Sequence, residues 1–447
     1  MTGTWHARAA ALNVDGRAVV DGERVAAAGG ATSADVNPAT GAVHAEVAAL
    51  DAVDIDRAVA AARTAFADGR WSGLSAEDRK ERMLVLADLM QQHADELALL
   101  DSLDMGKPVR EAREVDVPGA IATFRWYAEA ADKLVDELPS TPPGSTALVT
   151  REALGVVAAI TPWNYPLEIA AWKLAPALAL GNSVVHKPAS VSPLSALRVA
   201  DLALEAGIPA GVLNVVPGPG GRAGEAIGMH RDIDALTFTG STSVAKTLLE
   251  YSGRSNMKRL SLEAGGKSAN IVFADCEDLR AAAENAARGA FYNQGEVCSA
   301  NCRLLVERAI HDEFVALVAQ ASLAYAPGDP LRPSAGSSGP VHRGVRAAAD
   351  GRGVRDGGGG GHEGERDGLR ARGVRLDLVA RARPPCVAAA RRGHRLGEHR
   401  GRARAHDAVR RLQAVGLRAR PVAARVRRVL GAEDDLDPAR LRPRRHL

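Results

Sequence analysis

Residues 156–186, VVAAITPWNYPLEIAAWKLAPALALGNSVVH, contain a complete repeat of strand, turn, helix and strand. The apolar run Val156–Ile160 is typical of a strand that is buried on both faces. The apolar spacing of Leu167–Leu180 predicts a helix, and a second strand, Ser183–His186, follows it. Strands that alternate with helices in this way predict a parallel sheet.

The same alternation continues on both sides of this repeat. Further strands are expected at Val212–Val216, Ala235–Thr239, Arg259–Leu262, Asn270–Phe273 and Arg303–Val306. Helices are expected between them at Pro193–Ala206, Ala223–Met229, Ser243–Tyr251, Leu279–Ala290 and Ile310–Ala324, and before them at 54–69, 76–102 and 109–135. The pattern predicts an α/β fold with helices on both faces of the sheet, whose ligands bind at the carboxyl ends of the strands.

Composition divides the chain into two parts. The 447 residues are 46% apolar, so most of the chain can bury a core. Residues 341–447 contain 27 Arg, no Lys and 12 acidic residues, a net charge of +15, whereas residues 1–340 carry −12. All aromatic residues lie at or before Tyr325. A segment rich in Arg and Gly without aromatics is poorly suited to form a core, so the two parts need separate explanations.

The cysteines and the apolar runs indicate a cytoplasmic protein. Its four cysteines, Cys276, Cys298, Cys302 and Cys386, are too few and too unevenly spaced for a disulfide framework. No uncharged apolar run approaches the roughly 20 residues that cross a bilayer. The N-terminus, MTGTWHARAA, lacks the pattern of a signal peptide. We expect reduced thiols, no membrane partner and no metal site.

Two turns that follow predicted strands can act on a ligand. Gly240-Ser-Thr-Ser243 opens a helix whose first backbone N–H groups can hold a phosphate, although any strand–turn–helix needs a small residue at such a point. Asn164 stands between Pro162 and Pro166, which fix the backbone. Its amide can therefore stabilise an oxyanion or, alternatively, cap the following helix.

Charged residues end two other predicted strands. Lys187 and the nearby Ser190 can reach a ribose or a phosphate, and the alternative for Lys187 is a solvated surface position. Glu263 precedes Gly265 and Gly266. A carboxylate at this point can activate a water or form a structural ion pair.

The stretch FYNQGEVCSA, residues 291–300, contains the cysteine with the strongest chemical signal. Most lone cysteines are buried small hydrophobes. Cys298 is instead flanked by Gly295, Glu296 and Ser299, a polar loop that favours a partly exposed thiol with a tunable pKa. We interpret Cys302 and Cys276 as structural.

Five stretches in this order, ITPWNYP, VVHKPAS, FTGSTS, LEAGGKSANIVFAD and FYNQGEVCSA, resemble the aldehyde dehydrogenase superfamily. The resemblance runs from about residue 30 to Pro333 and implies NAD(P)-dependent oxidation of a small-molecule aldehyde to an acid. WYAEAADK, SGRSNMKR and LEAGGKSANIVFADC are most similar to bacterial dehydrogenases of γ-glutamylamino-butyraldehyde and related ω-amino aldehydes. Family members are homodimers or homotetramers, and the resemblance implies no nucleic-acid partner.

The resemblance assigns catalytic roles to four residues. Cys298 matches the nucleophile, Glu263 the general base and Asn164 the oxyanion donor. Lys173 matches a lysine that stands behind Glu263 in the proton path. These roles imply a thiohemiacetal and then a thioester on Cys298, which an activated water hydrolyses.

The resemblance also places residues at the cofactor NAD. Lys187 matches a lysine on the adenine ribose, Gly240 and Ser241 match the turn beneath the pyrophosphate, and Trp163 lies beside the nicotinamide. Ser190 stands where NAD-specific relatives often carry a Glu that binds the ribose 2′-hydroxyl, so we expect NADP to be accepted as well. Further contacts are expected from Ile160, Thr161, Pro162, Gly220, Phe238, Val244, Glu263 and Gly265.

The resemblance divides the chain into four regions. Residues 1–125 and 148–258 are expected to form a Rossmann-type NAD(P)-binding domain, and 126–147 an oligomerisation hairpin. Residues 259–335 are expected to form a partial catalytic domain, and 336–447 an irregular Arg/Gly-rich tail.

This tail does not continue the family pattern. An expected EEIFGPV segment is reduced to Gly339-Pro-Val341. Read one base later with suitable codons, Ala408–Arg420 can spell PFGGFKQSGFGRD and Gly393–His399 can spell GTVWVN, both family motifs. We interpret the residues from about 342 as translated out of frame after an internal deletion. The alternatives are an inactive relic that at most binds cofactor, and an Arg-rich nucleic-acid arm, which has no aromatics for stacking.

Overall fold

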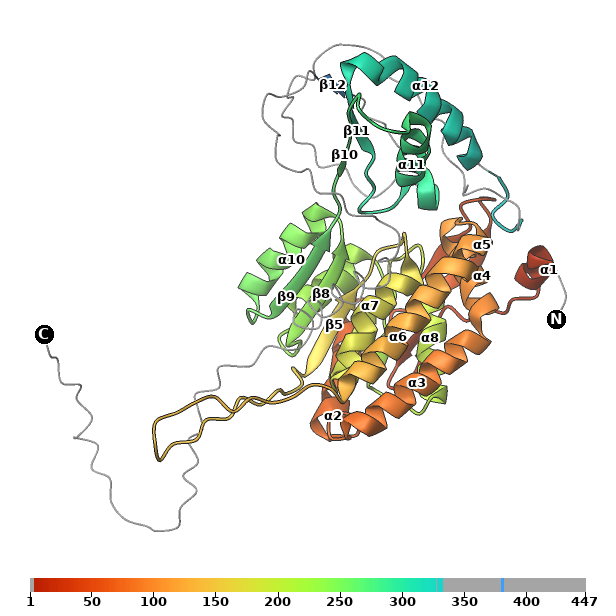
Figure 1. The fold of residues 1–447 in the computed structure, drawn as a ribbon. Coiled ribbons are helices and arrows are strands. Elements are labelled where there is room, and N and C mark those ends of the chain that lie inside the picture. Colours follow the sequence, from red (N-terminus) through yellow and green to blue (C-terminus); the bar gives the residue numbers. More distant parts are fainter. Residues whose placement is uncertain (1–3, 327, 333–378, 382–447) are drawn as a thin grey trace, which may run out of the picture.

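The computed structural model describes residues 4–326, 328–332 and 379–381. These residues form a seven-stranded sheet, a three-stranded sheet and a two-stranded sheet. In Figure 1 the largest sheet and its helices form the lower body of the molecule, and the three-stranded sheet with two helices lies above it. The α/β class predicted from the sequence is confirmed. Within this described part, no helix combines the length and apolar character that crossing a bilayer requires.

The larger sheet has the strand order β2-β1-β7-β6-β5-β8-β9. Its parallel strands are β5 (Val156–Ile160), β6 (Ser183–Lys187), β7 (Leu213–Val215), β8 (Ala235–Gly240) and β9 (Arg259–Ala264). The ends of these strands lie within two residues of the predicted ones. β1 (Ala18–Val20) and β2 (Glu23–Val25) add an antiparallel edge that the sequence analysis did not identify.

Alternate residues of β5 pack into two different cores, one on each face of the sheet. Val157 and Ala159 belong to one core, and Val156, Ala158 and Ile160 belong to the other. Because both faces are covered, the strand is apolar throughout. The first core includes α3 (Ala76–Gln92), α6 (Val117–Ala131), α7 (Pro166–Ala179) and α8 (Leu194–Glu205), and the second includes α2 (Ala52–Ala67), α9 (Glu225–Met229) and α10 (Thr242–Arg254).

Two long helices predicted from the sequence are divided in the structure. The predicted helix 76–102 is α3 followed by α4 (Ala94–Met105), because His93 between them has φ −97° and ψ 17°. Gly106 then ends α4 in the left-handed conformation, with φ 74°. The predicted helix 109–135 is α5 (Val109–Glu111), η1 (Ala112–Asp116) and α6, which ends at Ala131.

The smaller unit follows β9. Its strands β10 (Ala269–Val272), β11 (Arg303–Glu307) and β12 (Val379–Arg381) are parallel and lie in that order. A separate core joins this sheet to α11 (Leu279–Phe291) and α12 (His311–Ser322). Since β9 is the edge strand of the larger sheet, the boundary between the sheets falls after Ala264, whereas we had expected a domain boundary at 258/259.

Shorter segments complete the described chain. α1 (Trp5–Ala10) precedes the antiparallel pair β3 (Thr32–Val36) and β4 (Val43–Ala48). Residues 133–150 form a ribbon that projects from the lower body in Figure 1 and contains an antiparallel bridge between Glu137 and Val149. The expected hairpin 126–147 overlaps this ribbon, but residues 126–131 belong to α6. The tail expected from residue 336 lies outside the described residues apart from β12.

Candidate active site

Cys298 lies in the loop between α11 and β11 and is exposed. The loop includes Asn293 (φ 50°) and Gln294 (φ 60°), and this left-handed conformation costs a non-glycine residue about 1 kcal/mol. Their side-chain amides anchor the loop, because Asn293 Nδ2 donates to Asn164 O at 3.0 Å and Gln294 Nε2 donates to Met105 O at 3.2 Å. Cys298 is thus an exposed thiol on a loop that is tied to the larger unit.

The Asn164 side chain reaches the same loop. Asn164 is buried in the turn between β5 and α7, and its Nδ2 donates to Glu296 O at 2.6 Å. The alternative of a helix cap is not observed, because α7 begins at Pro166 and its N-cap residue, Tyr165, makes no side-chain cap hydrogen bond. The fold therefore places a side-chain amide two residues from Cys298, across a sequence separation of 132 between Asn164 and Glu296.

Glu263 lies at the end of β9, opposite Thr239 of β8, and is exposed. The alternative of a structural ion pair is not seen within the part of the chain that the structure describes. Three residues later, Gly266 N donates to Cys298 O at 3.3 Å. The loop that follows β9 thus contacts Cys298, the predicted nucleophile, and the carboxylate of Glu263 is open to water.

Lys173 is buried in α7 beneath the sheet. Its ammonium donates to Thr237 Oγ1 at 3.1 Å. Thr237 lies two residues before Thr239, the strand partner of Glu263. Lys173 therefore lies against the inner part of β8, below the strand end that carries the predicted base.

Residues predicted at the cofactor gather at the carboxyl ends of β5, β6 and β8, which are neighbours in the sheet. Thr161 N donates to Lys187 O at 3.1 Å, and the buried Lys187 ammonium donates to Pro188 O at 3.1 Å. Ser190 is exposed, and its hydroxyl donates to Gly218 O at 2.9 Å. Of the other predicted residues in this region, Ile160 and Phe238 are buried, Pro162 is half-buried, and Trp163, Gly220 and Gly265 are exposed.

The turn after β8 leaves the N-terminus of α10 exposed. Ser241 is the N-cap residue, and its Oγ accepts a hydrogen bond from Val244 N at 3.3 Å. A Cβ at Gly240 would lie 2.5 Å from the ring of Phe238, so this position requires glycine. A Cβ at Gly220, the first residue of η2 (Gly220–Gly224), would meet no atom within 4 Å. An open helix N-terminus attracts phosphate, so these residues fit the pyrophosphate of a dinucleotide.

Sequence reasoning missed a buried charged cluster behind the Cys298 loop. Lys107 is fully buried, pairs with Asp116 and lies 4.1 Å from the ring centroid of Tyr165. Burial raises the pKa of Glu296 to about 8, and the Lys107 charge only partly opposes this. Burial also raises the pKa of Glu111 to about 7. No local pattern marks Lys107, because lysine side chains are almost always solvated.

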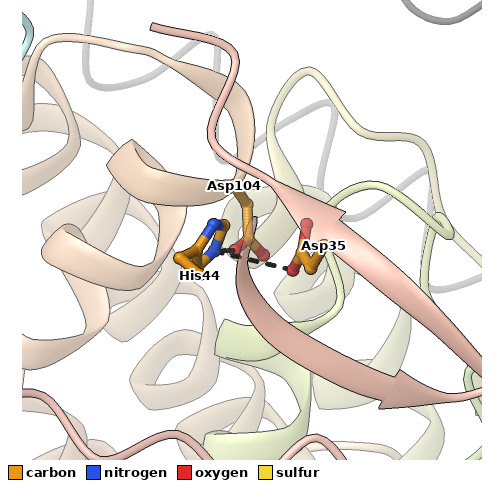
Figure 2. A group of neighbouring side chains, drawn as sticks. All are labelled: Asp35, His44 and Asp104. Carbon is orange, nitrogen blue, oxygen red and sulfur yellow. Dashed lines mark hydrogen bonds and ion pairs between the residues drawn. The ribbon is translucent and has the colours of Figure 1, made fainter. Parts of the chain in front are cut away.

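A second buried group, drawn in Figure 2, brings together Asp35 of β3, His44 of β4 and Asp104 of α4. His44 Nε2 lies 3.2 Å from Asp104 Oδ1 and 3.7 Å from Asp35 Oδ2. Burial and then the Asp104 carboxylate raise the pKa of Asp35 to about 8, and burial lowers that of His44. The three side chains are spaced closely enough to hold a metal ion. Asp104 is distant from Asp35 and His44 in the sequence, so no local pattern predicts this group, and no metal site was expected.

Comparison with known proteins identifies a matching family and similar chains. Residues 25–368 match the aldehyde dehydrogenase family, so the match extends beyond Pro333, where we expected the resemblance to end. The chain is 54% identical over 330 residues to the NADP/NAD-dependent aldehyde dehydrogenase PuuC of Escherichia coli (strain K12), covering 74% of this chain and 67% of that protein.

Two solved structures are similar as well. One is the P. syringae AldA indole-3-acetaldehyde dehydrogenase in complex with NAD+ (TM-score 0.73, 53% identity, 75% of this chain and 68% of that chain). The other is the γ-glutamyl-γ-aminobutyraldehyde dehydrogenase of Burkholderia cenocepacia J2315 (TM-score 0.73, 52% identity, covering 75% of this chain and 68% of that chain). The chain thus spans about two thirds of the length of these relatives.

Proposed function

Because the chain belongs to the aldehyde dehydrogenase family, we propose that it oxidises an aldehyde to a carboxylic acid with NAD or NADP as the oxidant. One observation carries the proposal: two other segments hydrogen-bond to the backbone of the loop that carries the exposed Cys298. The Asn164 amide binds Glu296 two residues before Cys298, and Gly266 N, from the loop that follows Glu263, binds Cys298 O.

Cys298 is the nucleophile in this proposal. Its thiolate attacks the aldehyde carbon, the C=O electron pair moves to the oxygen, and a thiohemiacetal forms. One N–H of the Asn164 amide stays on Glu296 O, while its second N–H and the backbone N–H of Cys298 donate to the oxyanion. One such donor is worth about 3 kcal/mol in the transition state.

A bound nicotinamide would supply the acceptor for the hydride of the thiohemiacetal carbon, and this oxidation would leave a thioester on Cys298. Glu263 takes a proton from a water whose oxygen attacks the thioester carbon. The C–S bond then breaks, the Cys298 thiolate leaves, and the carboxylic acid is released. We assign Lys173, held to Thr237 beneath β8, to the path that carries the proton away.

The cofactor is proposed to lie across the carboxyl ends of β5, β6 and β8, with its pyrophosphate at the N-terminus of α10 beside Gly240 and Ser241. Lys187 and Ser190 are proposed to face the adenine ribose. The Ser190 hydroxyl carries no charge and therefore does not repel a ribose 2′-phosphate. This supports the use of NADP as well as NAD.

The substrate class that we propose is an ω-amino aldehyde. The chain is 52% identical to a solved γ-glutamyl-γ-aminobutyraldehyde dehydrogenase and 48% identical over 329 residues to an aminoacetaldehyde dehydrogenase of Pseudomonas aeruginosa.

We also propose that the ribbon 133–150 takes part in a homodimer or homotetramer. Its apolar side chains Val135, Leu138 and Leu148 are at least 70% exposed, so they are available for contact with a second copy of the chain. Light scattering of the purified chain measures the mass of the oligomer and tests this proposal.

An assay of NADH formation tests the activity. The full chain is incubated with NAD+ and either γ-aminobutyraldehyde or a simple aliphatic aldehyde, with Cys298→Ala as the matched control. NADH formed by the wild type and not by the variant supports the proposal, and faster turnover of the amino aldehyde supports the substrate class. Binding of NAD+ by both proteins without NADH formation supports the inactive relic instead.

The tail requires a separate test, because residues 333–378 and 382–447 lie outside the described part. The family match reaches residue 368, past residue 342, where we place the change of frame. An uninterrupted family sequence in the shifted frame of the gene supports the proposed frameshift, and stop codons in that frame contradict it. DNA binding that depends on salt and disappears when residues 342–447 are removed supports the nucleic-acid arm.

A further inference from the structure

Glu296 connects the nucleophile loop to the oxyanion donor through its backbone. Its carbonyl oxygen accepts from Asn164 Nδ2 at 2.6 Å, and the reactive thiol lies two residues later. Any movement of Glu296 therefore displaces the Asn164 amide and the Cys298 backbone together.

One oxygen of the Glu296 carboxyl lacks a hydrogen-bond donor. Its Oε2 is buried and has no hydrogen-bond partner among the residues that the structure describes. The cation that acts on it is Lys107, which is itself buried, paired with Asp116 and placed over the ring of Tyr165, the neighbour of Asn164. The positive charge that acts on Glu296 is thus already compensated by Asp116.

Other ionisable groups surround the Lys107–Asp116 pair. α4 contributes Asp101, α5 contributes Glu111, and α7 contributes Glu168 near its start. The phenols of Tyr165 and Tyr292 and the guanidinium of Arg288 complete the set. Of these groups Lys107 acts on the Glu296 carboxyl, and the larger effect of burial disfavours a negative charge there.

We propose that Glu296 is a positioning residue whose neutral carboxyl keeps the Cys298 loop seated against Asn164, and whose ionisation unseats that loop. This inference rests on the proposed role of Cys298 as the nucleophile. A buried carboxylate oxygen without a donor disfavours the ionised form, so the ionised side chain turns toward Lys107 or toward water. Its backbone follows, and a negative charge also appears two residues from the sulfur.

Burial raises the pKa of Glu296 to about 8, so its carboxyl ionises within the pH range in which the protein can be assayed. Below pH 8 the carboxyl is neutral, and the loop holds the geometry described above. Above pH 8 the ionised side chain unseats the loop, so we expect the Cys298 thiol to react more slowly than it does when residue 296 stays neutral.

The test measures the alkylation rate of Cys298 by iodoacetamide between pH 6 and 10, followed by peptide-resolved mass spectrometry that separates Cys298 from the other cysteines. Glu296→Gln keeps the shape and the neutral state of the side chain. Glu277→Gln, at an exposed position, is the matched control. The assay needs neither aldehyde nor NAD, so it gives an answer even if the chain has no dehydrogenase activity.

The expected wild-type profile contains two transitions, one from the thiol and one near pH 8, and E277Q reproduces it. E296Q is expected to show the thiol transition alone. It should match the wild type at pH 6.5 and react about two- to tenfold faster at pH 9, since one pKa unit is a factor of ten. Identical wild-type and E296Q profiles overturn the proposal.

A paired variant, Lys107→Met with Asp116→Asn, removes the compensated charge pair together. Because Lys107 lowers the pKa of Glu296, the second transition should move to higher pH in this variant. A second transition that stays in place contradicts the role of Lys107. If circular dichroism shows that the paired variant does not fold, the comparison of E296Q with the wild type still decides the proposal.

Discussion

The side-chain amide of Asn164 donates a hydrogen bond to the carbonyl oxygen of Glu296 at 2.6 Å. This bond joins the turn after β5 to the loop that carries Cys298. It holds a strong donor within two residues of the thiol, on a backbone framed by Pro162 and Pro166. The amide is therefore positioned before any substrate arrives, which is the property that an oxyanion donor requires.

Replacement of Asn164 by Ala is expected to lower kcat by about 10²- to 10³-fold, because one oxyanion donor is lost. NAD+ affinity should stay within about twofold of the wild type, since the cofactor contacts are unchanged. Steady-state kinetics with titration of NAD+ measures both quantities. Asn285→Ala, on the exposed face of α11, is the control. Equal kcat values for N164A and the control exclude the assigned role.

The buried pair Lys107–Asp116 is expected to behave asymmetrically on mutation. Lys107→Met alone or Asp116→Asn alone leaves one buried charge without its partner and should lower the free energy of unfolding by about 3–5 kcal/mol. The double variant removes both charges and should recover most of the loss. Urea unfolding of the four proteins measures the coupling. Additive losses contradict a direct interaction.

Glu111 is expected to make stability depend on pH. Burial raises its pKa to about 7 in the folded protein, above the ordinary value of 4.5 in the unfolded chain. Its stabilising contribution is therefore complete below about pH 4.5 and is lost as the pH rises to 7, because the folded state holds the proton more tightly. Between about pH 4.5 and 7, the free energy of unfolding of the wild type should therefore fall by about 1–3 kcal/mol more than that of Glu111→Gln. Unfolding curves at pH 4.5, 6 and 7.5 test this, and unchanged slopes contradict it.

Replacement of Ser190 by Glu is expected to restrict the cofactor to NAD. The added carboxylate repels the 2′-phosphate of NADP, so KM for NADP should rise about tenfold or more while KM for NAD changes little. Ser190→Ala removes only the hydrogen bond to Gly218 O and serves as the control. A strict preference for NAD in the wild type would already contradict the proposed tolerance of NADP.

Several elements were predictable because their signals are local. β5 was predicted with its observed ends, since an uninterrupted run of β-branched and small apolar residues suits a strand covered on both faces. The strands β1 to β4 were missed. β1 and β2 have only three residues each, and β2, β3 and β4 contain charged residues, so none of the four is a clear apolar run. The break at His93 was missed as well, because the apolar spacing runs through it.

The sequence by itself indicated which residues carry the proposed chemistry, because Cys298, Glu263 and Asn164 lie in the motifs that resemble the aldehyde dehydrogenase superfamily. It also determined the order of strands and helices, which follows from side-chain periodicity along the chain. Only the tertiary structure decided which of these residues meet. The parallel neighbours β5, β8 and β9 bring the Asn164 turn and the Glu263 loop to one edge of the sheet, and the Cys298 loop joins them there. The charge of Glu296 was also decided at that level, because a pKa depends on burial and on neighbours such as Lys107, neither of which a local pattern specifies.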